Sequence, residues 1–487
     1  MNPLITLVPP LVALPLILIL GEKRRDAREL VILVAGVLMF LANLAVYREV
    51  MAGGTPVSGA LPLVGDFALK LSAEPIGVLF GLLASFLWIV TTVYSIGYMR
   101  DHHEKNQTRF YACFAISLAA VMGAAYADNL MTLFVAYETL TLCTLPLVMH
   151  SGTAKARSAG KVYLGILLFT SIGLLLPAVT WVALAAGTLD FRPGGVMADA
   201  GLSHAALAVL VALFVFGTAK AAVMPLHRWL PAAMVAPTPV SALLHAVAVV
   251  KTGVFALLKV MTYTIGIDTL QGANAAAWVL PVVAFTIIAS SCVAFTKDNL
   301  KARLAYSTIS QLSYIVMAAL LATSLSISGG AFHIVTHAFA KITLFFCAGA
   351  ILVTAHKENI SDMDGLGRRM PVTFACFAIG TVGIIGIPPA AGSWSKLMIA
   401  GGSFDTGTVF WALVLMFSTL LNIAYLAPIP IRAFFRPDPG VPAGSPSPRE
   451  ETSAPMRWAL TLTAALTLLL FLFPGPLIDL LELIRWR

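Results

Sequence analysis

Apolar residues occupy the chain in long blocks, each about as long as a helix needs to cross a bilayer. Short stretches containing charged residues, glycine or proline separate these blocks. The pattern predicts an all-α polytopic membrane protein with about fourteen transmembrane helices. We expect them near residues 3–20, 29–48, 75–97, 110–126, 128–150, 159–187, 203–232, 239–264, 274–296, 301–325, 327–356, 371–400, 407–433 and 455–473.

Two predicted helices are longer than a bilayer requires and contain proline clusters. The seventh contains Pro225, and the twelfth contains Pro388 and Pro389. Because proline removes a helical hydrogen bond, we expect both helices to be broken or strongly tilted. An offset of 169 residues relates the two breaks and also aligns AYET at 136–139 with AYST at 305–308. Helices 4–8 and 9–13 are therefore predicted to be two five-helix repeats, inverted because each has an odd number of helices.

The composition agrees with a membrane protein. Hydrophobic residues make up 59% of the 487 residues and charged residues 11%, so a soluble enzyme and a nucleic-acid-binding protein are excluded. The five cysteines stand singly in apolar segments, without a CxxC pair. No dinucleotide, P-loop, zinc-protease or nucleophile-elbow motif occurs either. We expect no cofactor, no metal site and no catalytic or redox centre within the chain itself.

The basic residues predict the orientation of the helices. Of 31 Lys and Arg residues, 21 fall in loops after odd-numbered helices, 5 lie on the opposite side and 5 lie within helices. Because cytoplasmic loops are enriched in Lys and Arg, we expect the odd-numbered loops in the cytoplasm and both termini outside it. The low-complexity linker Pro437–Pro455 is then cytoplasmic, with a composition typical of disorder. The first apolar segment has no signal-peptide cleavage pattern and is predicted to be a retained helix.

Charged side chains inside the membrane segments are the candidate functional residues, since each costs about 2.5–3.5 kcal/mol at a helix centre. The deepest are Glu138 in helix 5, Lys220 before the break in helix 7, and Lys251 in the middle of helix 8, six residues after His245. A packing ion pair between Glu138 and Lys220 is one explanation. It leaves the other buried lysines unexplained. A lysine buried without a counter-ion releases its proton readily, which a proton relay requires.

Helix 11 carries His333, His337 and Lys341 at positions i, i+4 and i+8, nearly on one face. Imidazoles titrate near neutral pH, so this stripe is predicted to relay protons through water. A metal site is the alternative, but the stripe offers no carboxylate or thiolate. Lys396, after the break in helix 12, is either an exit-side proton carrier or a lysine that reaches the interface. Lys259 is interpreted as a lysine reaching the interface.

Four segments resemble one family closely: AYET at 136–139, MPLHRWLPAAMVAPTPVSALLHAVAVVKTGVFALL, HAFAKITLFFCAGA and GIPPAAGSWSKL. They are similar to the antiporter-like proton-pumping subunits of complex I, energy-converting membrane hydrogenases and Mrp-type antiporters. The resemblance covers nearly the whole chain. It implies fourteen helices in the arrangement predicted above, with a central hydrophilic axis.

The resemblance also implies roles for single residues. Glu138 is similar to the family's helix 5 glutamate, Lys220 to the paired helix 7 lysine and Lys251 to the central helix 8 lysine. His333 and His337 resemble the helix 11 histidines.

Lys396 bears on the type of subunit. A lysine at this position resembles the D-type protein of Mrp antiporters and some complex I pumps, whereas the M-type pumps of complex I have a glutamate. The modest length and the absence of a lateral arm count against the long L-type and Mrp A-type proteins. Ala232 and Ala233 depart from the family, because many relatives have an acidic residue after the WLP sequence.

The sequence thus predicts a proton-translocating component of the plasma membrane, working with other membrane subunits and most like the D-type protein of Mrp-type Na+/H+ antiporters. The alternative is a pump component of a complex I-like NADH:quinone oxidoreductase or a hydrogenase. A stand-alone secondary transporter fits less well, since the charges are spread over five helices instead of one pocket. The expected divisions are 1–109 (helices 1–3), 110–264 (first repeat), 274–433 (second repeat), 434–454 (linker) and 455–487 (helix 14).

Overall fold

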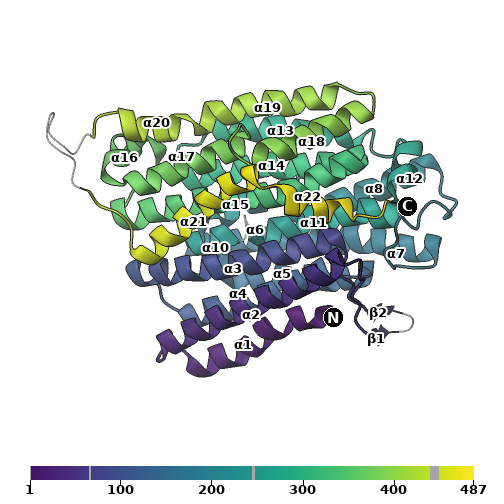
Figure 1. The fold of residues 1–487 in the computed structure, drawn as a ribbon, viewed down its shortest axis with the longest axis horizontal. Coiled ribbons are helices and arrows are strands. Elements are labelled where there is room, and N and C mark those ends of the chain that lie inside the picture. Colours follow the sequence, from purple (N-terminus) through teal and green to yellow (C-terminus); the bar gives the residue numbers. More distant parts are fainter. Residues whose placement is uncertain (1, 65–66, 244–246, 439–448, 487) are drawn as a thin grey trace.

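The computed structural model describes residues 2–64, 67–243, 247–438 and 449–486. Long helices run side by side in one bundle, and both chain ends lie at the same end of it (Figure 1). Within the described residues, eleven helices are long and apolar enough to cross a membrane. They are η1 and α1 together (Pro3–Leu20), α2 (Arg25–Met51), α3 (Pro75–Asp101), α4 (Gln107–Ala125), α5 (Leu130–Val148), α6 to α7 (Ala154–Ala186), α13 (Val279–Thr296), α14 (Leu300–Leu321), α15 (Ser324–Ala355), α19 to α20 (Phe410–Phe435) and α21 (Ala454–Leu472).

Three interrupted helices complete the fourteen expected from the sequence, counted over the same residues. Helix 7 consists of α8 (His204–Gly217) and the short η3 (Ala219–Ala221), followed by α9 (Trp229–Ala232) and η4 (Ala233–Val235). Helix 8 consists of α10 (Thr238–Ala242) and α11 (Val249–Val260), and helix 12 of α17 (Pro371–Ile385) and α18 (Gly392–Asp405). The all-α polytopic fold is confirmed. The breaks in helices 7 and 12 are confirmed too, each in the fourth helix of its predicted repeat.

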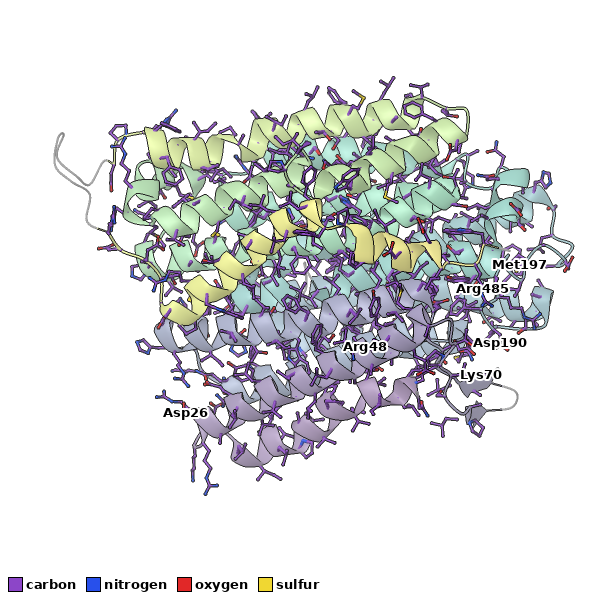
Figure 2. All side chains as sticks on the ribbon, viewed as in Figure 1. Asp26, Arg48, Lys70, Asp190, Met197 and Arg485 are labelled. Atoms are coloured by element: carbon purple, nitrogen blue, oxygen red, sulfur yellow. The ribbon has the colours of Figure 1, made fainter. Side chains whose placement is uncertain are left out.

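Short elements lie within or between the long helices. The helical ones are η2 (Ser171–Leu175), η6 (Met261–Ile265), α12 (Ile267–Gly272), η7 (Ile360–Met363), α16 (Leu366–Arg369) and α22 (Gly475–Glu482). The strands β1 (Leu61–Val64) and β2 (Phe67–Leu69) pair antiparallel, an addition to the all-α expectation. Figure 2 shows Lys70, Asp190 and Arg485 at one end of the bundle and Asp26 at the other. This alternation is what successive membrane crossings produce.

Helix 8 differs from its prediction. The sequence predicts one continuous helix over 239–264, whereas α10 ends at Ala242 and α11 begins at Val249. The amide of Ala248 donates to the carbonyl of Leu243 at 2.8 Å, five residues back, which is the hydrogen-bond spacing of a π-helical turn. His245, a predicted relay residue, falls at 244–246, outside the described residues.

The break in helix 7 follows from close packing and a side-chain hydrogen bond. A Cβ atom on Gly217 would lie 2.6 Å from the amide nitrogen of Leu175, so α8 can approach η2 only with glycine there. The chain then leaves the α-helix, and the indole of Trp229 donates to the freed carbonyl of Ala219 at 2.9 Å. Irregular backbone is tolerated at this depth because it is buried in protein and its polar groups find partners.

The linker is tied to α17 at its described C-terminal edge. The Glu451 carboxylate accepts hydrogen bonds from the amide of Val372 at 2.6 Å and the hydroxyl of Thr373 at 2.8 Å. These are free donors in the first turn of α17, where a negative charge is favourable. The division of the chain into repeats and linker stays a prediction.

Candidate functional site

Five lysines within the helical bundle are almost completely buried: Lys220, Lys251, Lys259, Lys341 and Lys396. Of these five lysines, only Lys259 has a carboxylate oxygen of a described residue within 4 Å. The other four are held by carbonyls, hydroxyls, aromatic rings or imidazole. These partners stabilise an ammonium group without fixing its charge as a carboxylate does, so each lysine can exist in either protonation state.

Lys220 is placed by the break in helix 7. Its Nζ donates to the Tyr137 carbonyl at 2.7 Å and to the Thr141 hydroxyl at 2.6 Å, and it lies 3.1 Å from the centre of the Tyr137 ring. A Cβ atom on Gly253 of α11 would come within 2.6 Å of the Lys220 carbonyl carbon. The unwound segment around η3 therefore packs closely between α5 and α11.

Glu138 lies on α5 between the two residues that hold Lys220. Its carboxylate acts on the Lys220 charge through space, and no ion pair within 4 Å joins the two in the described residues. One carboxylate oxygen, Oε1, is buried without a hydrogen-bond partner in the described part of the chain. The predicted pair is thus neighbouring and electrostatically linked, without direct contact.

Lys251 and His337 lie in direct contact inside the bundle. The Lys251 Nζ lies 2.6 Å from the Nδ1 of His337, and both side chains are buried. Lys251 is on α11 and His337 is on α15, so the contact joins helices 8 and 11. It brings together two residues that lie 86 positions apart in the sequence.

His333 continues the polar path along α15. Its ring centre is 5.9 Å from that of His337, a gap that one water molecule can bridge. Its Nδ1 lies 2.8 Å from the Ser395 hydroxyl, and its Nε2 lies 3.1 Å from the Gln311 side-chain oxygen. Both ring nitrogens therefore have hydrogen-bond partners, of which the Ser395 hydroxyl can both donate and accept.

Lys396 stands at the break in helix 12. Its Nζ donates to the carbonyls of Ile385 at 2.7 Å and Ile384 at 3.1 Å, where α17 ends, and to the Thr419 hydroxyl at 3.1 Å. The side chain is 8% exposed, so the alternative of a lysine reaching the interface is wrong. Pro388 and Pro389 lie in the segment that separates α17 from α18, and Pro225 lies in the corresponding segment after η3.

Lys341 faces a different neighbour from the two histidines on its helix. Its Nζ donates to the Ser307 hydroxyl of α14 at 2.9 Å and to the Leu304 carbonyl at 3.4 Å. Ser307 occupies the position that the internal repeat aligns with Glu138. The second half of the chain thus pairs a buried lysine with a hydroxyl where the first half has a carboxylate.

The interpretation of Lys259 as a lysine reaching the interface is also wrong. Its side chain is 1% exposed, and its Nζ forms an ion pair with Glu74 at 2.5 Å. Glu74 carries no functional signal in the sequence, because it precedes an apolar block instead of interrupting one. Gln311 and Ser395 carry none either, since uncharged polar residues are common in membrane helices.

The comparisons with known proteins agree with the family resemblance found in the sequence. The family described as NADH:quinone oxidoreductase/Mrp antiporter, TM matches residues 127–422. This range runs from just before α5 into α19 and contains every site residue predicted from the sequence. The chain belongs to this family.

Among the relatives of this antiporter family, NAD(P)H-quinone oxidoreductase chain 5 of Synechocystis sp. is 33% identical over 366 residues. The alignment covers 71% of this chain and 52% of that protein. NADH-quinone oxidoreductase subunit L of Mycobacterium tuberculosis is 32% identical over 498 residues, covering 93% of this chain and 73% of that one. The chain spans about half the length of the first relative.

Two solved structures share the antiporter-family fold. One is the membrane-bound sulfane sulfur reductase, an archaeal respiratory membrane complex, with a TM-score of 0.83 at 22% identity. The other is the Mrp complex from Dietzia sp. DQ12-45-1b, with a TM-score of 0.85 at 21% identity. Both likenesses cover 99% of this chain and 96% of the other chain. The fold predicted from the resemblance is confirmed.

Proposed function

We propose that this chain is a proton-translocating membrane component of a multi-subunit complex. The observation that carries the proposal is the 2.6 Å contact between the Lys251 amine and the His337 imidazole inside the bundle. A lysine and a neutral histidine at hydrogen-bonding distance can share a proton, and Lys251 has no carboxylate within 4 Å in the described residues. If the pair served only to hold the helices together, the stability it provides would be small compared with the free energy needed to bury a charged lysine.

The row of buried residues Lys251, His337, His333 and Lys396, called the axis below, provides successive proton acceptors. Lys251 donates to the Nδ1 of His337, and His337 passes a proton from its other nitrogen toward His333. Beyond His333, the Ser395 hydroxyl lies on α18, one residue before Lys396. The same positive charges repel one another: Lys251 and Lys396 both act on His333. A proton arriving at one end of the row therefore favours release at the other.

Glu138 supplies the negative charge that controls the first lysine. While Glu138 is ionised, it stabilises the ammonium form of Lys220. When Glu138 takes up a proton, Lys220 loses that stabilisation, and its charge repels a proton on the axis beyond it. Gly253, which packs on Lys220 and lies two residues after Lys251, couples the positions of these two lysines mechanically.

The orientation follows from the basic loops. We propose that the bundle end holding Asp26 faces the cytoplasm and that both termini face the other side of the plasma membrane. The 21-to-5 distribution of Lys and Arg supports this orientation.

Two kinds of complex are consistent with this row of buried residues. The Mrp D-type cation/proton antiporter predicted from the sequence is supported by the Lys396 position and by the structural likeness to an Mrp complex. A redox-driven pump is the second candidate, favoured by relatives that are quinone oxidoreductase subunits. The Mycobacterium tuberculosis relative, a subunit L, is 32% identical in an alignment that covers 93% of this chain and 73% of that protein, which supports an L-type protein about as well. Transport of Na+ belongs to the first candidate alone.

Purification of the complex from its native membrane distinguishes these candidates. Other antiporter subunits and proton movement driven by a Na+ gradient support the Mrp-type assignment. Quinone-binding or iron–sulfur partner proteins and proton movement driven by electron transfer support the redox pump. A complex that moves no protons under either driving force contradicts the proposed function.

A further inference from the structure

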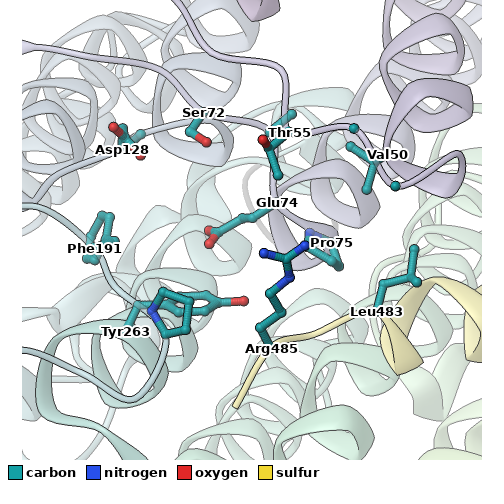
Figure 3. Close-up of a pocket in the computed structure, with 15 residues that line it drawn as sticks. Val50, Thr55, Ser72, Glu74, Pro75, Asp128, Phe191, Tyr263, Leu483 and Arg485 are labelled. Atoms are coloured by element: carbon teal, nitrogen blue, oxygen red, sulfur yellow. The ribbon is translucent and has the colours of Figure 1, made fainter. Parts of the chain in front are cut away.

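A cavity of about 310 Å³ opens at the bundle end that holds the two termini (Figure 3). Its lining comes from the segments after the second, fourth, sixth and eighth helices and from the residues after α22. The polar lining residues are Thr55, Ser72, Glu74, Asp128, Tyr263 and Arg485. None of the lysines or histidines of the axis described above lines this cavity. It is a second polar site, outside the row that the proposed mechanism uses.

Glu74 and Lys259 form an ion pair at the wall of this cavity. Glu74 is the N-cap residue of α3, immediately before Pro75, and its carboxylate points into the cavity (Figure 3). Lys259 approaches from α11, pairs with Glu74 at 2.5 Å and donates to the Ala127 carbonyl. The Phe191 ring lies 4.7 Å from its Nζ. The Lys259 side chain is 1% exposed, whereas the Glu74 side chain is 19% exposed.

Other charged groups surround the pair. Asp128 lines the cavity, interacts with the Lys259 charge and is influenced by the Lys70–Asp190 ion pair beside it. Burial raises the pKa of the Asp128 carboxyl, and it also raises that of Glu74, against the opposing effect of Lys259. Arg485, from the C-terminal segment, and Tyr263 line the same cavity as Glu74 (Figure 3).

α11 connects this pair with the axis. Lys251 and Lys259 are eight residues apart on the same helix, about 12 Å along it and within about a quarter turn of the same side. Thr252 lies beside Lys251 at the start of this stretch, and Thr262 and Thr264 lie in η6, just beyond Lys259. Each hydroxyl is buried without a hydrogen-bond partner in the described residues. Buried hydroxyls in this condition are places where water molecules complete the hydrogen bonds.

We propose that Glu74 and Lys259 form a proton-exchange site through which Lys251 communicates with the aqueous phase at this end of the bundle. Within the ion pair, a Lys259 N–H bond breaks and a Glu74 O–H bond forms, leaving both groups neutral. Glu74 then gives the proton to water in the cavity, and the Lys259 amine takes up a proton delivered from Lys251. The cycle consumes one proton from the axis and releases one to the cavity, and it runs equally in reverse.

This inference rests on the proposed function, so its test includes a variant of the axis. Proton translocation is measured in vesicles that contain the complete complex, with the amount of assembled complex determined for each variant. Lys259→Arg preserves the positive charge and the ion pair, but a guanidinium does not release its proton. We expect Lys259→Arg and Glu74→Gln to lower the rate about tenfold or more. Glu74→Asp should recover part of it with a shifted pH profile.

A blocking experiment tests the cavity independently of folding. Thr55→Cys places a thiol on the cavity wall, and a bulky membrane-impermeant thiol reagent added from that side should then slow transport at least about fivefold. The reagent on the parent protein gives the baseline, since the chain has five native cysteines.

The outcomes separate the exchange site from the proposed function. If Lys259→Arg, Glu74→Gln and the blocked Thr55→Cys protein all translocate protons at the parent rate while Lys251→Ala is inactive, the exchange site is wrong and the proposed function stands. If Lys251→Ala is itself fully active, the proposed function fails first. A rate lowered only in proportion to the amount of assembled complex means that the ion pair holds α3 to α11, and this overturns the exchange role.

Discussion

The amine of Lys251 on α11 and the Nδ1 of His337 on α15 lie 2.6 Å apart, and this contact joins the two predicted five-helix repeats. Lys251 belongs to the last helix of the first repeat, and His337 to the third helix of the second. A proton that crosses from one residue to the other thus passes between the two halves of the molecule. In the proposed relay, this contact is therefore the step between the two halves.

Glu138→Gln should abolish proton translocation and leave assembly intact. The substitution keeps the size of the side chain but removes the negative charge that acts on Lys220. We expect a loss of at least about tenfold in the vesicle assay. Glu482→Gln, which neutralises an exposed carboxylate on α22, is the matched control and should have no effect. Parent-like transport in an assembled Glu138→Gln complex would show that Glu138 has no part in coupling.

The contact between α11 and the unwound segment of helix 7 can be tested through Gly253. A Cβ atom there would lie 2.5 Å from the Ala221 nitrogen, so Gly253→Ala should destabilise the protein by about 1–3 kcal/mol and displace Lys220. Gly165→Ala in α6 is the control, because no atom lies within 4 Å of its Cβ position. Since alanine favours a helix, the control should be neutral or slightly stabilising. Equal thermal stability of both variants in detergent would refute the close packing.

Much of the axis could be predicted from the sequence because lysine, glutamate and histidine stand out within apolar blocks. Lys220, Lys251 and Lys396 were found in this way, and the structure places all three in the interior. Their partners could not be found, since a contact such as His333 with Gln311 depends on how distant helices pack. Glu74 gave no signal because it lies in a polar loop, where a carboxylate is ordinary. The interruption of helix 8 could not be predicted either, because residues 243–248 contain no proline.

Stability outside the membrane should depend on pH through Asp364. Hydrogen bonds from the Arg432 guanidinium, with a smaller contribution from Arg436, hold the pKa of Asp364 below its usual range. A carboxyl whose pKa is lowered by folding stabilises the native state above its unfolded pKa, near 4, and this contribution disappears as the pH falls through the lowered value. Asp364→Asn should therefore lower the melting temperature at pH 7 and match the parent in strong acid. A difference that is constant with pH would contradict this.

The topology prediction concerns the Pro437–Pro455 linker. A single cysteine placed there, in a chain otherwise without accessible thiols, should react with an impermeant reagent only from the cytoplasmic side. The basis is the enrichment of Lys and Arg in loops on that side. A cysteine at Thr55, at the other end of the bundle, is the control and should react only from outside. Reversed labelling of both sites would invert the assigned orientation.

The most direct test of the proposed function is proton translocation by the Lys251→Arg complex. Arginine retains the positive charge beside His337, but it does not release a proton at accessible pH. The relay therefore predicts that Lys251→Arg is as inactive as Lys251→Ala, while Lys161→Ala on the exposed surface of α6 transports like the parent. If Lys251→Arg translocates protons at the parent rate, Lys251 supplies only a fixed charge and the proton does not pass through it.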